Sequence, residues 1–176
     1  MPWYQHGGGQ ISIQNGGANH SPKTFASTGR LFNYAGPTHI LDVNCLTKGS
    51  KYTYTVEFKL LDENDDNKPI GCDKFAKYNS DNSCPFFTLV ITIPDQQDPK
   101  YLHFSNTYNG EWDPEKYNFF STEFEVTDEI YTATSAKMLF SGPRAGIAIL
   151  FDETKLELKV EDECDNLIPN GHFEVR

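Results

Sequence analysis

The sequence lacks any run of about 20 apolar residues, so it predicts no membrane-spanning helix and no membrane insertion. It also lacks a Gly-x-Ser-x-Gly motif, a phosphate-binding glycine loop and a dinucleotide-binding fingerprint, and so the usual signatures of several enzyme classes. Its cysteines form no C-x-x-C pair, and no Cys/His set has zinc-ligand spacing. Basic residues are few, with 15 Lys and Arg against 25 Asp and Glu, for a formal net charge of −10. An acidic surface repels phosphate backbones, so we expect no nucleic-acid partner.

The start of the chain also lacks the features of a signal peptide. Residues 1–9 have no charged start followed by an apolar core. If the protein is secreted, we expect its signal to lie upstream of this sequence.

Short stretches that alternate between polar and apolar residues recur along the chain. In residues 51–60 every even position is apolar or aromatic and every odd position is polar, as in a strand with one buried and one wet face. Further strands are expected at residues 10–14, 38–45, 85–94, 102–104, 119–126, 136–143, 145–151 and 154–160, and a helical turn at 128–134. This spacing predicts an all-β fold, an antiparallel β-sandwich or jelly roll, over residues 1–160, with residues 161–176 as a linker turn and a separate strand.

Four cysteines set the expected covalent links. Cys72 and Cys84 bracket a polar stretch, and a disulfide between them would hold a long loop and imply an oxidising compartment. We therefore expect this bond and a secreted or cell-surface protein. The spacing does not decide the partners of Cys45 and Cys164, which can pair with each other, pair with cysteines of neighbouring modules, or stay free.

Four stretches, in their order, carry a resemblance to a known family. They are residues 34–39 with 45–54 (Tyr-Ala-Gly-Pro-Thr-His and Cys-Leu-Thr-Lys-Gly-Ser-Lys-Tyr-Thr-Tyr), residues 120–128, residues 139–146 with 149–156, and residues 166–174 (Asn-Leu-Ile-Pro-Asn-Gly-His-Phe-Glu). Together they resemble carbohydrate-binding modules of families 4, 9 and 22, which are galactose-binding-like jelly rolls. In such modules the fourth stretch is the first strand, yet here it comes last. We therefore expect the chain to start just inside one repeat of a tandem array and to end just inside the next.

The resemblance implies a structural calcium ion that ties the first strand of the module to the last. Asp152 and Glu174 match the positions that supply carboxylates, and backbone carbonyls near Lys48 or Ser50 would complete the set. Calcium accepts such oxygens without strict geometry. The alternative is that Asp152 only caps a strand and Glu174 is solvated.

The last stretch also predicts a local geometry. A return strand at residues 166–174 would run antiparallel to residues 154–160 and bring Glu174 back towards Asp152. Cys45 would then lie near Asp152 and Cys164 at the opposite end, which disfavours a bond between these two cysteines.

Aromatic side chains outside the expected core are candidates for stacking on a sugar, because a flat ring suits the C–H side of a pyranose. They are Trp3, Tyr4, Tyr78, Tyr101, Tyr108 and Trp112. The loop at residues 108–113 is the most attractive, since Asn109 and Glu111 add polar groups for sugar hydroxyls. Tyr52 and Tyr54 share one face of a strand and are expected in the core.

The sequence therefore predicts non-catalytic binding of a polysaccharide or glycan by a secreted, calcium-stabilised β-sandwich. Catalysis is not expected, because Glu123 and Glu125 lie on the wet face of their strand. The alternative is a structural repeat of an extracellular fibre, coat or appendage, which self-associates or joins a neighbouring repeat by strand exchange through residues 165–176. A third hypothesis is recognition of a protein or glycoprotein at a cell surface.

Overall fold

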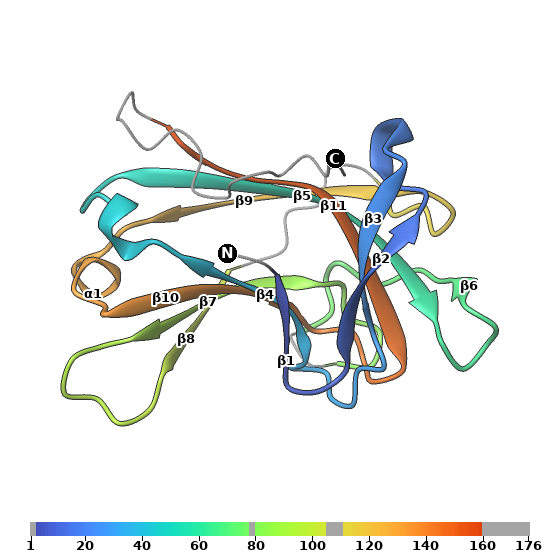
Figure 1. Cartoon of the computed structure of the whole chain (residues 1–176), viewed down its shortest axis with the longest axis horizontal. Coiled ribbons are helices and arrows are strands. Elements are labelled where there is room, and N and C mark those ends of the chain that lie inside the picture. The colour runs from blue at the N-terminus through green and yellow to red at the C-terminus, as the bar shows by residue number, and fades with distance from the viewer. Residues whose placement is uncertain (1–2, 78–79, 105–110, 160–176) are drawn as a thin grey trace.

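The structure, a computed structural model, describes residues 3–77, 80–104 and 111–159 (Figure 1). Its elements are β1 (Tyr4–His6), β2 (Gln10–Asn15), η1 (Ala18–His20), β3 (Lys23–Thr28), β4 (Gly36–Leu41), η2 (Val43–Cys45), β5 (Lys51–Asp62), β6 (Lys68–Pro69), β7 (Phe86–Thr92), β8 (Lys100–Phe104), β9 (Asn118–Glu125), α1 (Asp128–Tyr131), β10 (Ser135–Ser141) and β11 (Ile147–Leu158). Within the described ranges, no helix has the length and apolar character needed to cross a membrane.

Two antiparallel sheets pack face to face, which confirms the predicted all-β sandwich. One sheet has the order β1-β4-β10-β7-β8. The other has the order β2-β3-β11-β5-β6, with β9 also paired to β5. In Figure 1, β7, β8 and β10 of the first sheet lie below β5 and β9 of the second.

Aromatic side chains from both sheets meet between the two layers. Tyr52 and Tyr54 of β5 are fully buried, as the alternation predicted. The ring of Tyr54 stacks on Phe87 of β7, with centroids 4.9 Å apart, and on Phe140 of β10, at 5.1 Å. Because each ring buries a large apolar area, these contacts hold the two sheets together.

The last strand differs from the prediction. The two strands expected at residues 145–151 and 154–160 form a single strand, β11. Its register with β5 shifts between Asp152 and Lys155, where Glu153 has a φ of 48°. This is a β-bulge, and a bulge interrupts the alternation of side chains, which explains why the sequence indicates two strands.

Three other elements near the start of the chain were not expected in this form. The strand expected at residues 38–45 ends at Leu41, because the Asp42 side chain accepts a hydrogen bond from the Asn44 amide and caps the 3-10 helix η2. Strands β1 and β3 are not predicted by the sequence. β1 has only three residues, which is too short for an alternating pattern to be recognised.

One end of the sandwich closes around Arg30, whose side chain is 2% exposed. Its guanidinium donates hydrogen bonds of 2.7–3.4 Å to backbone carbonyls of Asn33, Ala35, Pro143, Arg144 and Ile147. Arg30 thereby joins the loop before β4 to the turn between β10 and β11.

Cys72 and Cys84 form the predicted disulfide, with their Cα atoms 5.0 Å apart. The bond closes the loop between β6 and β7, and an isolated bridge between Asp73 and Ser83 lies directly inside it.

Cys45 is the last residue of η2 and lies near the start of β5, because the Tyr52 hydroxyl donates a hydrogen bond to the Cys45 carbonyl at 2.8 Å. Leu158, at the end of β11, pairs with Tyr52, whereas Asp152 pairs with Glu57 in the middle of β5. Cys45 is therefore near the end of β11 and not near Asp152. The predicted position of Cys45 near Asp152 is wrong. The distance between Cys45 and Asp152 therefore no longer disfavours a bond between Cys45 and Cys164.

The last part of the chain lies outside the described residues, which end at Lys159. Cys164, Glu174 and the return strand expected at residues 166–174 fall in that part. Strand exchange through residues 165–176 and the boundary expected at residue 160 stay predictions.

Candidate functional site

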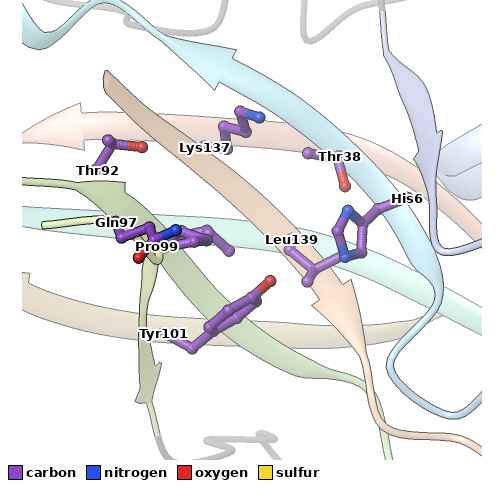
Figure 2. A pocket seen from close by; sticks show the side chains of 9 residues that line it. His6, Thr38, Thr92, Gln97, Pro99, Tyr101, Lys137 and Leu139 are labelled. Atoms are coloured by element: carbon purple, nitrogen blue, oxygen red, sulfur yellow. The ribbon is translucent and has the colours of Figure 1, made fainter. Parts of the chain in front are cut away.

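The outward face of the five-stranded sheet carries a groove of about 180 Å³, which we call the sheet groove. Side chains from β1, β4, β7, β8 and β10, and from the loop after β7, converge on it (Figure 2). They are His6, Thr38, Val90, Thr92, Gln97, Pro99, Tyr101, Lys137 and Leu139.

The floor of the groove follows from the alternation of side chains along β10. The residues on either side of Lys137 and Leu139 pack in the core, so these two side chains point outward. Leu139 stands opposite Thr38 of β4, and Lys137 stands opposite Val90 of β7, so all four share one face. Leu139, Thr38 and Val90 are buried and form the floor.

Two tyrosines lie on this face. Tyr101 of β8 stands opposite Val90 and is 43% exposed, so its ring forms an accessible wall of the groove. Tyr4 of β1 stands opposite Thr38 and therefore flanks the groove on the other side. The structure thus brings two of the aromatic residues proposed from the sequence to one surface.

The polar groups of the groove are neutral or basic. Burial lowers the pKa of His6, and the nearby charge of Lys137 lowers it further. His6 is therefore neutral at pH 7, where its ring can donate one hydrogen bond and accept another. Thr38, Thr92 and Gln97 add hydroxyl and amide groups, and no described lining residue carries a carboxylate.

Trp3 does not join this surface. Its ring lies between the sheets, with its centroid 4.9 Å from that of Phe151 and 5.9 Å from that of Phe140. Because side chains alternate along an extended chain, the outward position of Tyr4 turns Trp3 inward. Trp3 is thus a core residue in this structure rather than a platform for a sugar.

Trp112 is also engaged by the protein itself. Its indole N–H donates a hydrogen bond to the Ile70 carbonyl at 3.2 Å, and its ring packs against the core. Glu111 beside it is exposed. Tyr78, Tyr108 and Asn109 lie outside the described residues, so the binding loop expected there stays a prediction.

The expected calcium ligand Asp152 lies in the other sheet, under the segment that contains η1. Its side chain is 1% exposed, and its two carboxylate oxygens accept hydrogen bonds from the amides of Ala18 and Glu153, each at 2.9 Å. Burial raises the pKa of Asp152, and these two amides oppose the rise. A buried carboxylate of this kind gains most from a bound cation.

Gly17 leaves space beside this carboxylate. A Cβ atom at Gly17 would lie 2.2 Å from Oδ2 of Asp152 and 2.4 Å from the carbonyl oxygen of Lys23. The two oxygens thus face the same small space, and carboxylate and carbonyl oxygens are the ligands that calcium prefers. They are two of the roughly six to eight oxygens that a calcium ion takes, and the described residues contain no group of three or more His, Cys, Asp or Glu side chains that could hold a metal.

Lys48 does not belong to this cluster. Its side chain forms an ion pair with Asp128 at 2.7 Å, at the end of the sandwich where β5 begins. Asp152 pairs with Glu57, which is six residues from Lys51 along β5. A strand rises about 3.3 Å per residue, so Asp152 lies about 20 Å from the end of β5 where Lys48 is. The carbonyl oxygen that lies in the same small space as the Asp152 carboxylate belongs to Lys23. Glu174 lies outside the described residues, so its role stays a prediction.

Sequence reasoning missed His6, Thr38, Lys137 and Leu139. Alternation along residues 135–141 places Lys137 and Leu139 on the face opposite Ala136 and Met138, so part of the signal was present. The strand order that brings β1, β4 and β10 together is not encoded in any local pattern.

No family model matches the sequence, and no curated protein matches it. Solved structures do match. The tandem CBM22-1–CBM22-2 domain of Paenibacillus barcinonensis Xyn10C is 18% identical with a TM-score of 0.63, and the match covers 92% of this chain and 42% of that one. The CBM22-1 xylan-binding domain of the same protein is 17% identical with a TM-score of 0.61, over 91% of this chain and 87% of that one. The C-terminal family 22 carbohydrate binding module of Clostridium thermocellum Xyn10B is 11% identical with a TM-score of 0.62, over 91% and 88%.

These matches confirm the fold that the sequence resemblance implied. At such low identity they show the fold alone: the chain has the β-sandwich fold of these modules.

Proposed function

We propose that this chain binds a polysaccharide, without catalysis, in the sheet groove. The observation that carries the proposal is an exposed aromatic ring, Tyr101, beside hydroxyl, amide and imidazole groups on one open sheet face. An aromatic face suits the C–H side of a pyranose, and the polar groups suit its hydroxyls. The fold is shared with modules described as binding xylan, which supports the same class of ligand here.

The size of the groove favours a polymer over a small molecule. Pockets that enclose a drug-sized ligand have volumes of about 300–1,000 Å³. The sheet groove, at about 180 Å³, is smaller than this, so it suits contact with a short part of a longer chain. A single module of this kind would bind weakly, and several modules on one polypeptide would gain avidity.

The proposal includes a structural calcium ion held by the carboxylate of Asp152 and the carbonyl of Lys23. The buried charge of Asp152 and the space next to Gly17 support it. The ion would supply positive charge that tethers the η1 segment to β11. We also place the protein outside the cell, which the Cys72–Cys84 disulfide supports.

Calorimetric titration with soluble xylan, β-glucan, mannan and chitin oligosaccharides tests the proposal. We expect binding to at least one, and the variant Tyr101→Ala should lose about tenfold or more of the affinity, because the stacking surface is removed. The matched control is Tyr131→Ala. Tyr131 is similarly exposed, at 54%, but ends α1 and does not line the groove.

Two results would contradict the proposal. One is the absence of binding to every polysaccharide tested. The other is an equal loss of affinity in both tyrosine variants, which would place the ligand elsewhere.

A further inference from the structure

Lys137 places a positive charge in the sheet groove that no described carboxylate neutralises. Ion pairs in the described ranges join Lys48, Lys68, Lys100, Lys116, Arg144 and Lys159 to acidic partners, and none of them includes Lys137. Lys137 is half-buried on β10, next to the buried side chains of the floor (Figure 2).

The chain has a formal net charge of −10, yet no described acidic residue lines the groove. In the described ranges, six of the chain's 15 Lys and Arg residues form ion pairs, so an unpaired lysine is common in this chain. What sets Lys137 apart is its place: it is half-buried and lines a groove. A half-buried ammonium loses part of its hydration, and an anion that enters the groove would restore the lost interaction.

The other titratable groups on this face do not supply that anion. They are His6, Tyr4, Tyr101 and His103, and none of them is a carboxylate. Lys100, at the edge, is paired with Glu129. In the loop that contributes Gln97 and Pro99, Asp98 is exposed and does not line the groove.

We infer that the sheet groove selects a polysaccharide with a neutral backbone that carries occasional uronic acid groups. Lys137 pairs with the uronate carboxylate, while Tyr101 contacts a sugar ring of the backbone. This inference rests on the proposed function, because it names the chemistry of the ligand in the same groove.

The net charge of the protein decides between a sparsely and a densely charged polymer. At physiological ionic strength, charges are screened beyond about 8 Å, so Lys137 acts on a carboxylate inside the groove with little opposition from distant acidic residues. A polyuronate would place many further carboxylates against an acidic surface and be repelled. One groove lysine therefore matches one acidic group among neutral sugars.

The experiment compares one polymer before and after removal of its charge. Glucuronoxylan and the same glucuronoxylan after carboxyl reduction are titrated into the full chain at low and at physiological salt. We expect the native polymer to bind about tenfold or more tightly than the reduced one, with the difference shrinking as salt rises. Polygalacturonate, as a dense polyanion, is expected to bind more weakly than glucuronoxylan.

Three variants locate the effect. Lys137→Gln should bind both polymers equally, at the affinity of the wild type for the reduced form. Lys137→Arg should keep the preference, because it keeps the charge. Lys51→Gln is the matched control, since Lys51 is an exposed strand lysine in the opposite sheet, and it should behave like the wild type.

The outcomes separate this inference from the proposed function. Equal binding of the two polymers by the wild type would overturn the inference and leave polysaccharide binding intact. A preference that persists in Lys137→Gln would also overturn it. Binding to neither polymer nor to any neutral glycan would overturn the proposed function itself.

Discussion

Arg30 shows how much of this fold depends on a single side chain. A guanidinium remains charged at any pH that a protein experiences, so its burial cannot be relieved by loss of a proton. The protein compensates with backbone carbonyls from two separate loops. Carbonyl dipoles thus take the place of water around a buried cation.

Substitution of Arg30 by lysine should therefore destabilise the sandwich although the charge is kept. The lysine ammonium has three N–H donors close together, whereas the guanidinium has five that are spread over a plane, so lysine cannot reach all the carbonyls. We therefore expect the free energy of unfolding to fall by about 2–4 kcal/mol. Urea denaturation measures it. Arg144→Lys is the control, because Arg144 is exposed and its ion pair with Asp62 is worth at most about 1 kcal/mol. Equal losses in the two variants would show that burial of Arg30 is not the cause.

The neighbours Trp3 and Tyr4 show what decides the role of an aromatic residue. The two side chains differ little in chemistry, yet one packs against Phe151 and the other flanks the groove. Composition makes both candidates for a sugar platform. Trp3 and Tyr4 differ in the side of the sheet to which each side chain points. That side can be assigned only when the strand with which β1 pairs is known.

Among the elements, strands with a regular alternation of polar and apolar residues were predicted best from the sequence. β5 shows it without a break, and both its position and its buried face were predicted. β11 contains a bulge at Asp152, and there the prediction divides one strand into two. The bulge lies at Asp152, the residue that we propose as a calcium ligand, and it breaks the alternation that would otherwise set the direction of the side chains there.

The loop between β6 and β7 is an element held by a covalent bond. Replacement of both Cys72 and Cys84 by serine should lower the free energy of unfolding by about 3 kcal/mol, because the unfolded chain gains the freedom that the bond removes. Urea denaturation without reductant, compared with the wild type, measures the change. The double variant should keep the far-ultraviolet spectrum of a β-sandwich. An unchanged unfolding midpoint would mean that the disulfide does not contribute to stability.

For the molecule as a whole, calcium should act as a stabilising ligand of the folded state. At a calcium concentration 100-fold above the dissociation constant, binding would add about 2.7 kcal/mol, which corresponds to a rise in Tm of about 5–10 °C. Differential scanning calorimetry with calcium and with EDTA measures the rise. Asp152→Asn should abolish it, whereas Glu157→Gln, an exposed position farther along β11, should leave it unchanged. The calcium proposal fails if the wild type melts at the same temperature in both conditions.

The raised pKa of Asp152 adds a pH dependence to this test. In EDTA, the ionised carboxylate is buried without a cation, so it lowers stability at neutral pH. This cost is fully present above the folded-state pKa and disappears as pH falls towards the unfolded value of 3.8. The contribution of calcium to Tm should therefore be largest at neutral pH and decrease with acidification.

The fold class, the disulfide and the buried face of β5 could be predicted, since each depends on residues close together in sequence. The position of the Lys23 carbonyl beside Asp152 could not be predicted, because no local pattern distinguishes Lys23 from Lys48 and only the folded chain shows which of them lies near Asp152. The groove was missed for the same reason. Tyr101 and Lys137 carry no shared local motif, and they meet only through the order of five strands.

The strand order also has a consequence for how the chain folds. In each sheet a strand from the first part of the sequence pairs with one from the last part: β4 pairs with β10, and β3 pairs with β11. Neither sheet is therefore complete until about a hundred further residues have been synthesised, and such long-range pairing makes folding slow.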